Sequence, residues 1–381
     1  MADTATISII IPTKNAGAEF RDTLAAIRKQ TRASEILVVD SGSSDGTLDL
    51  ACQFGARTIS IAPETFNHGE TRNLGIRHGT GQICVMLVQD AVPVGETWLE
   101  TLIAPFSDDQ VVGVTGRHIP RPDSDLLGRW QVEYQNEFLG DKIRIQRMES
   151  WDEFLGLSFE ERLRLVSFDN VCSALRRDFW ETCPFRPLPF AEDLDWGVRS
   201  LTAGRRLVYD PSIRVVHSHT RPAAYHMRRS YVSGRVVPKL LHLPPVNPGL
   251  RNDEELFALL GFLCGEVQAM VKEHVTDWKT FSVSCQPESR LWNSLSFAVG
   301  RRQPPPSYKS NPVRASFYHI LESLETMREK NAGDLPLASV FASALGEAVG
   351  SFAASYYNWC DEQGVLSEGM KRLDKALAQG V

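Results

Sequence analysis

The sequence predicts an α/β protein, in which a mostly parallel β-sheet is covered by helices on both faces and followed by an α-helical C-terminal region. In the first 120 residues, short apolar runs rich in β-branched side chains alternate with amphipathic segments of helical period. This alternation is typical of a parallel sheet that is buried on both sides. Beyond about residue 243, strand patterns nearly vanish and helical patterns continue.

The expected elements follow one another in a regular order. Strands are expected at 7–11, 36–39, 57–61 and 83–88, and helices at 18–30, 48–54 and 69–78. Residues 123–166 have a mostly helical, polar pattern. After the segment 170–175, strands are expected at 207–209 and 213–216, and a helix is expected at 192–203.

A domain boundary is expected near residue 243, which divides the chain into domains 1–243 and 244–381. Prolines cluster just beyond it, and helices are expected at 253–273, 314–330 and 336–361, with a proline-rich loop at 303–312. We expect this helical region to pack on the first domain or against a second copy of the chain, which would make a homo-oligomer.

Composition excludes several classes of protein. The 381 residues are 43% hydrophobic and carry a net charge of −6, which suits a soluble globular protein and argues against bulk nucleic-acid binding. Seven cysteines without CxxC spacing indicate buried free thiols rather than a zinc site or disulfides. Without a signal-peptide pattern or an apolar run of about 18 residues, we expect a cytoplasmic protein that can still lie on the inner face of the membrane.

Polar residues follow three of the expected strands where each strand ends. They are Pro12-Thr13-Lys14-Asn15, the segment 40–47 and Gln89-Asp90-Ala91. In a parallel sheet these ends lie side by side, so they would form one cleft, where ligands of such sheets bind. Each loop alone is also explained by the turn preference of Asp, Ser and Gly.

These motifs closely resemble the opening of bacterial family 2 glycosyltransferases. The resemblance rests on ISIIIPTKN at 7–15 and ILVVDSGSSDGT at 36–47, with FNHGETRNLG at 66–75 similar to rhamnosyltransferase-like members. PFAEDLDWGVR at 189–199 and YDPSIRVVHSH at 209–219 resemble the acceptor-side half. The resemblance covers about residues 6–225 and implies the Rossmann-like fold called GT-A.

The resemblance implies an inverting glycosyltransferase with a nucleotide-diphosphate sugar donor, and it favours dTDP-L-rhamnose. The acceptor would be a hydroxyl of a cell-surface polysaccharide or of a lipid-linked glycan precursor. The expected nucleotide-sugar-binding residues are Pro12, Thr13, Asn15, Asp40, Gly42, Ser43, Arg72, Gln89 and Asp90.

A divalent cation, Mg²⁺ or Mn²⁺, is expected beside the donor. The family has Asp-x-Asp at the end of the fourth strand, whereas this chain has Val88-Gln89-Asp90 and so lacks the first carboxylate. Asp90, diphosphate oxygens, water and a histidine could still complete six-coordination. By resemblance, the histidine comes from His217 or His219, which point to the same side of a strand, with His219 favoured.

The acidic cluster Glu192-Asp193-x-Asp195 is the candidate for catalysis. Inverting transfer needs one general base, and by resemblance this base is Asp193. Glu192, Asp195 and Trp196 would orient neighbours or the acceptor, and Arg72 would offset charge on the leaving diphosphate. The cluster would also suit an ordinary acidic helix N-terminus.

Residues 205–240 carry eight basic side chains against one acidic residue, Asp210. Such a run is often only a solvated face. In an acidic protein it is also a candidate surface for anionic lipid or a lipid-diphosphate acceptor, which would make a peripheral membrane contact.

Three alternatives stay open. The donor could be a UDP-hexose or UDP-N-acetylhexosamine. A sugar nucleotidyltransferase would need a Gly-rich basic loop after the first strand, which residues 13–17 match poorly. An inactive nucleotide-sugar-binding or scaffold protein is favoured by the missing first Asp of the metal motif, whereas the retained Glu192-Asp193 weighs against it.

Overall fold

The computed structural model describes residues 5–257 and 337–378, and the chain divides into two compact units. The first comprises Met1–Pro122 and Val132–Ser218, and the second Asp123–Gln131 and His219–Val381. The predicted boundary near residue 243 stays a prediction, and that position follows helix α10 (Ala223–Leu240).

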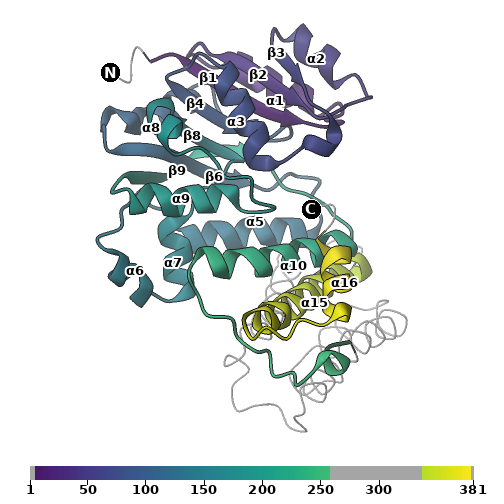
Figure 1. Cartoon of the computed structure of the whole chain (residues 1–381). Helices are drawn as coiled ribbons and strands as arrows, with labels where there is room; N and C mark the ends of the chain where they lie inside the picture. The colour runs from purple at the N-terminus through teal and green to yellow at the C-terminus, as the bar shows by residue number, and fades with distance from the viewer. Residues whose placement is uncertain (1–4, 258–336, 379–381) are drawn as a thin grey trace. The chain divides into compact units, whose positions relative to one another are not determined.

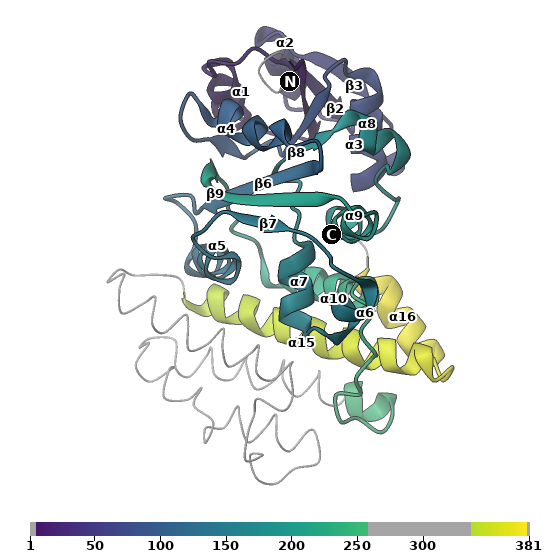
Figure 2. The same ribbon diagram turned by 90° about the vertical axis from the view of Figure 1, so that its left-hand side faces the viewer.

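The first unit is built around one mixed sheet, in the order β3-β2-β1-β4-β8-β6-β9-β5, with β7 beside β9 (Figures 1 and 2). Its strands are β1 (Ile7–Thr13), β2 (Glu35–Asp40), β3 (Arg57–Ser60), β4 (Ile83–Leu87), β5 (Val92–Pro93), β6 (Val111–Ile119), β7 (Arg144–Gln146), β8 (Cys172–Arg176) and β9 (Arg206–Val216).

Strand directions decide which loops share an edge. β1 runs parallel to β2 and β4, and β6 runs parallel to β9. β8 lies antiparallel between β4 and β6, with Leu87 opposite Cys172. The residues just before β8 therefore lie at the edge where β1, β2, β4, β6 and β9 end.

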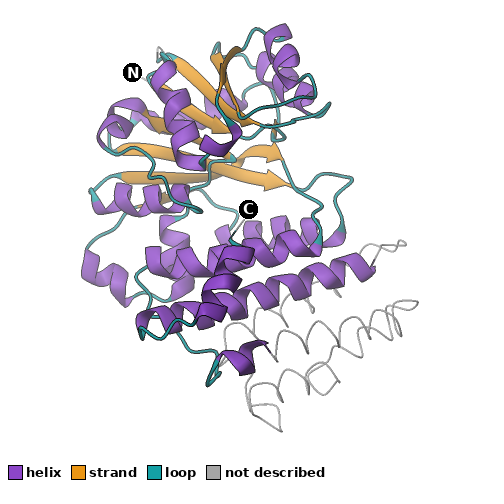
Figure 3. Cartoon of the chain, turned by 45° about the vertical axis from the view of Figure 1, so that its right-hand side comes forward, coloured by secondary structure: helices purple, strands orange, loops and turns teal. Residues whose placement is uncertain are grey.

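Helices cover the sheet because its central strands have no polar face. Every residue of β4 is buried, as are nearly all residues of β1. Their apolar side chains therefore pack against other elements on both faces of the sheet. The helices described in this unit are α1 (Phe20–Arg28), α2 (Thr47–Gln53), α3 (His68–His78), α4 (Trp98–Ile103), α6 (Trp151–Gly156), α7 (Phe159–Val166), α8 (Arg177–Thr182) and α9 (Glu192–Thr202) (Figure 3). α5 (Leu126–Leu139) has residues in both units.

The described helices of the second unit include α10, α15 (Leu337–Glu362) and α16 (Glu368–Leu377). Glycines bring α15 close to α10: a Cβ at Gly346 would lie 2.6 Å from the carbonyl oxygen of Ala223, and one at Gly350 would lie 2.2 Å from that of Met227. Larger residues there would push the two helices apart.

The predicted fold class is confirmed, with some differences in detail. The two strands expected at 207–209 and 213–216 form the single strand β9, and β6 was not predicted. Residues 123–166 include the short strand β7 among their helices. The described part of the expected helix 253–273 is helical at 253–257, while the helix expected at 314–330 and the loop at 303–312 lie outside the described residues.

The cysteine prediction is right only in part. Of the cysteines in the described residues, Cys84, Cys172 and Cys360 are buried free thiols, whereas Cys52 is exposed because it lies on the outer side of α2.

Candidate active site

The three predicted loops meet at the carboxyl edge of the sheet and are joined by hydrogen bonds. The Lys14 backbone N–H donates to Gln89 Oε1 at 2.9 Å, and the Asn15 N–H donates to Ser43 Oγ at 2.7 Å. Asn15 Oδ1 accepts from the Ser44 N–H at 2.9 Å, and Asn15 has a φ of 45°. The loops after β1, β2 and β4 thus form one connected wall.

The Asp40 carboxylate is held inside this wall. It accepts hydrogen bonds from Thr13 Oγ1 at 2.9 Å, from Ser43 Oγ at 2.5 Å, and from the N–H groups of Gly42 and Ser43 at 3.0 and 2.9 Å. Burial alone would raise the pKa of Asp40, but these donors lower it below its ordinary value. Four donors fill the acceptor positions of a carboxylate, so Asp40 first of all shapes its own loop.

Gly42 sits where this loop meets the next segment. It has a φ of 89°, and a Cβ there would lie 2.8 Å from Cγ of Pro63. Both the backbone conformation and the space therefore require glycine.

Asp90, His217 and His219 form the one group of candidate metal ligands found among the described residues, with ligand atoms within 4.8 Å of one another. Within this group, His217 Nε2 lies 3.7 Å from Asp90 Oδ1. One carboxylate and two imidazoles, with open positions for phosphate oxygens, suit Mn²⁺ or a similar first-row cation. The donor set thus fits the cation that the sequence predicts.

A histidine–aspartate pair, with His118 buried and Asp169 partly exposed, lies next to this group, and the sequence did not reveal it. His118 Nε2 lies 3.2 Å from Asp169 Oδ2, and the His118 ring meets the His217 ring edge-on at 5.3 Å. Burial would raise the pKa of Asp169, but the His118 charge and hydrogen bonds lower it. The pair was missed because β6 was not predicted, and because Asp169 precedes a strand whose reversed direction is not visible in the sequence.

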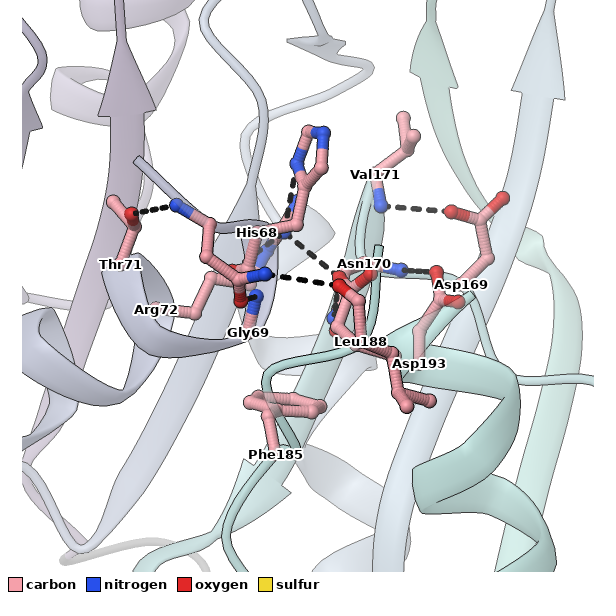
Figure 4. Close-up of polar contacts among 12 residues, drawn as sticks. His68, Gly69, Thr71, Arg72, Asp169, Asn170, Val171, Phe185, Leu188 and Asp193 are labelled. Atoms are coloured by element: carbon pink, nitrogen blue, oxygen red, sulfur yellow. Dashed lines mark hydrogen bonds and ion pairs between the residues drawn. The ribbon is translucent and has the colours of Figure 1, made fainter. Parts of the chain in front are cut away.

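Asp193 lies in the first turn of α9 at the same edge and is partly exposed. Its carboxylate accepts from the N–H of Asn170 at 3.3 Å (Figure 4). It also accepts from the N–H of Leu194 at 2.8 Å. Burial, followed by the negative charges of Glu192 and Asp169, raises the pKa of Asp193 to about 8. A carboxyl with a pKa near neutrality suits proton transfer at physiological pH.

Arg72 and Glu192, for which separate roles were expected, contact each other. Arg72 Nη1 donates to Glu192 Oε1 at 2.8 Å, and both side chains are buried. Arg72 therefore lies in an ion pair beside Asp193, and its expected contact with a donor diphosphate stays a prediction.

Asp195 and Trp196 point away from Asp193. Asp195 is buried between Arg199 at 2.8 Å and Arg186 at 3.4 Å. Trp196 lies in the core, where its Nε1–H donates to the carbonyl of Cys183 at 2.8 Å. An orienting role for these two side chains stays a prediction, and any such role would be indirect.

The basic segment 205–240 is partly neutralised within the chain. Arg206 pairs with Asp108 at 2.9 Å and Lys239 with Asp361 at 2.9 Å, while Arg235 pairs with Asp374. Among the described residues, no helix has both the length and the apolar character to span a bilayer.

Carboxylates and a candidate cation site at the carboxyl edge of this sheet define the class of GT-A glycosyltransferases. The family model for "Glycosyl transferase family 2" matches residues 8–181. The chain belongs to this family, in a rhamnosyltransferase-like branch.

Similar proteins agree with this placement. The chain is 30% identical over 232 residues to the O-antigen chain rhamnosyltransferase WbaN of Salmonella anatum, covering 60% of this chain and 70% of that protein. It is 31% identical over 233 residues to the O-antigen chain rhamnosyltransferase RfbN of Salmonella typhimurium, covering 60% and 71%.

A solved structure shares the fold. The mannosyltransferase PcManGT of Pyrobaculum calidifontis, in complex with GDP-Man and Mn²⁺, matches with a TM-score of 0.50 at 16% identity, over 99% of this chain and 88% of that one.

Proposed function

We propose that the protein transfers L-rhamnose from dTDP-L-rhamnose to a hydroxyl of a cell-surface polysaccharide or of its lipid-linked precursor, with inversion at the anomeric carbon. The support for donor and acceptor comes from the two Salmonella relatives, whose names describe rhamnosyl transfer to an O-antigen chain. The acceptor class also suits an enzyme that works at the inner face of the cell membrane.

The observation that carries the proposal is the position of Asp193. Its carboxylate touches Asn170, which follows Asp169 in the chain, and Asp169 contacts His118, whose ring meets that of the candidate cation ligand His217. A continuous set of contacts therefore joins the candidate base to the cation group on one edge. These contacts support a site in which the proposed proton acceptor lies near the leaving-group side of the reaction.

In the proposed reaction, Asp193 in its ionised form accepts the proton of the acceptor hydroxyl. The acceptor oxygen then forms a bond to the anomeric carbon while the bond from that carbon to the diphosphate oxygen breaks. The electron pair leaves with the nucleoside diphosphate. Because one displacement occurs on the face opposite the leaving group, the anomeric configuration inverts.

The cation and the loops serve the donor side. Asp90, His217 and His219 would hold Mg²⁺ or Mn²⁺, which supplies charge stabilisation for the leaving diphosphate when bound. The wall formed by Pro12, Thr13, Asn15, Gly42, Ser43 and Gln89 would bind the nucleotide, and Asp40 would keep this wall in shape.

The first test is donor choice. Calorimetry with Mn²⁺ present should show tighter binding of dTDP-L-rhamnose than of UDP-glucose or UDP-N-acetylglucosamine. NMR of the transferred sugar should show the anomeric configuration opposite to that of the donor. Preference for a UDP-sugar would overturn the proposed donor, and retained configuration would overturn the single displacement.

The second test is Asp193→Asn. Loss of the base should reduce transfer by a factor on the order of 10²–10⁴, while donor affinity stays near the wild-type value. Asp22→Asn, which removes an exposed carboxylate from α1, is the control and should keep full activity. A wild-type protein that binds the donor but shows no Asp193-dependent transfer or donor hydrolysis would instead indicate a nucleotide-sugar-binding or scaffold protein.

The third test concerns the cation. Because His217→Ala removes one of three proposed protein ligands, it should weaken Mn²⁺ binding by about tenfold or more, measured by the electron paramagnetic resonance signal of free Mn²⁺. His78→Ala, which removes a histidine from the end of α3, is the control. Equal Mn²⁺ affinity in wild type and His217→Ala would remove His217 from the ligand set.

A further inference from the structure

The Arg72–Glu192 ion pair is buried beside the proposed base. The two side chains are only 6% and 7% exposed. Arg72 Nη1 also donates to the carbonyl of His68 at 3.1 Å, and its Nε has no hydrogen-bond partner within the described residues. Burying two charges is costly, so a pair in this position is poorly explained by stability alone.

Asn170 connects this ion pair to Asp193. Its side-chain Nδ2 donates to Glu192 Oε1 at 3.2 Å, and its backbone N–H donates to Asp193 Oδ2 at 3.3 Å. The Asn170 Oδ1 in turn accepts from Ser173 Oγ at 3.2 Å, which fixes the amide orientation. One residue therefore donates hydrogen bonds to both neighbouring carboxylates, so we expect a shift of Glu192 to be passed on to Asp193.

Other residues of the segment 66–75 hold the chain that leads into α9. Asn67 Nδ2 donates to the carbonyl of Leu188 at 2.9 Å, and Asn73 Nδ2 donates to that of Phe185 at 2.8 Å. A Cβ at Gly69 would lie 2.4 Å from the carbonyl oxygen of Arg186, so only glycine allows this approach. The segment 66–75 thus contacts the chain before Glu192 through two hydrogen bonds and one close backbone approach.

The backbone just before Glu192 has an unfavourable conformation that such contacts can stabilise. Ala191 has φ 59° and ψ 39°, a left-handed conformation that is unfavourable for a residue other than glycine. A strained residue persists only when the surrounding contacts determine its conformation. Here those contacts come from α3 on one side and from Asn170 on the other.

We propose that Arg72, Glu192 and Asn170 are positioning residues, which hold the Asp193 carboxylate in place and set the charge that it faces. In this arrangement Arg72 acts through Glu192, and it does not bind the donor diphosphate. The inference rests on the proposed function, because it assumes that Asp193 is the base.

The charges around Asp193 predict how the pKa of its carboxyl changes when a neighbour is replaced. The charged groups that act on it are Glu192 on α9, Asp169 before β8, with its partner His118 on β6, and Arg72 on α3. Glu192 and Asp169 disfavour the ionised form of Asp193, and Arg72 favours it. Removing Glu192 or Arg72 should therefore shift the pKa of Asp193 in opposite directions.

The experiment compares the pH dependence of kcat in three variants. Glu192→Gln should move the acid limb of the profile to lower pH, and Arg72→Gln should move it to higher pH, each by about one unit. The double variant Arg72→Gln/Glu192→Gln should lie between them. Donor affinity measured by calorimetry should stay within about twofold of the wild type in all three, because none of the changed side chains binds the donor.

Arg72→Gln leaves Glu192 buried without its partner and can fail to fold. In that case Glu192→Gln and the double variant decide the question, since the double variant leaves no unpaired buried charge and Glu192→Gln keeps an amide oxygen that can accept from Arg72. The acid limb of the double variant should lie above that of Glu192→Gln. Coincident limbs in these two variants and the wild type would overturn the inference, and so would a loss of donor affinity of about tenfold or more in the double variant, which would indicate a diphosphate contact.

Asp193→Asn distinguishes a failure of the proposed base from a failure of the proposed positioning role. If this variant keeps transfer activity, the proposed base is wrong and the positioning role falls with it. If it loses transfer while the acid limbs of the other variants coincide with that of the wild type, only the positioning role is wrong.

Discussion

The loop around Asp40 and the helix start around Asp193 lie at the same edge of one sheet, but they treat their carboxylates differently. Asp40 accepts four hydrogen bonds from its own wall, and the pKa of its carboxyl is lowered. Asp193 accepts two backbone hydrogen bonds and faces two other carboxylates, and its pKa is raised to about 8.

This difference shows how one edge can supply both a fixed structural anion and a proton acceptor. A carboxylate surrounded by donors stays ionised and holds a loop together, whereas one beside like charges can exchange a proton near neutral pH. Two acidic residues that follow strands or open helices cannot be told apart by residue type. The residues that surround each carboxylate therefore decide whether it is structural or exchanges a proton.

The largest expected effect is on the pH dependence of transfer. Because Asp193 must be ionised to accept a proton, log kcat should rise by about one for each pH unit below its pKa and level off above about pH 8. A pH series between 5.5 and about 9.5, with donor saturating at each point, measures this directly. A flat profile across pH 6–8 would show that Asp193 is ionised throughout and would remove the contrast with Asp40.

Asp40→Asn should lower stability through its loop. The amide loses charge-assisted hydrogen bonds and places donor hydrogens against the N–H groups of Gly42 and Ser43, at a cost of about 1–3 kcal/mol. Urea unfolding at pH 7 measures the loss. Asp178→Asn is a matched control, because Asp178 is an exposed carboxylate that accepts a backbone hydrogen bond from Phe179. Its unfolding curve should stay close to that of the wild type.

The two carboxylates should also respond to pH with opposite signs in stability. The lowered pKa of Asp40 adds stability above its ordinary value of 3.8, and this stability is lost as the pH falls through the folded-state pKa. The raised pKa of Asp193 makes its ionisation unfavourable in the folded state, so stability is lost as the pH rises from about 4 to about 8.

The melting temperature of Asp193→Asn, relative to that of the wild type, should therefore increase between pH 5 and pH 8. The deficit of Asp40→Asn should instead shrink below about pH 4. Thermal unfolding followed by circular dichroism in matched buffers measures both. Parallel curves for the two variants would contradict the proposed difference in surroundings.

The smallest effect on stability is expected at Ala191, the N-cap residue of α9, whose first turn contains Asp193. Glycine relieves the left-handed strain but adds chain entropy to the unfolded state, so Ala191→Gly should change stability by less than about 1 kcal/mol, in the stabilising direction. Ala203→Gly at the other end of α9, where φ is −77°, should be destabilising. If both variants lose stability equally, the strain at Ala191 is not significant.

Several features of this protein could be predicted from its sequence because they depend on short-range patterns. Alternating apolar runs and amphipathic segments gave the α/β class, and polar residues after the strands gave the edge on which Thr13, Asp40 and Asp90 meet. The acidic start of α9 was visible in the same way. The family resemblance added the expected base at Asp193 and the histidines near residue 217.

Other features were decided only by the tertiary structure, because they depend on contacts between distant segments. The antiparallel direction of β8 brings Asp169 and Asn170 to the site, and β6 brings His118. Arg72 was expected to offset charge on a leaving diphosphate, yet it is paired with a carboxylate 120 positions away. No local pattern encodes such a pairing, since burial and charge at a position are fixed by what packs against it.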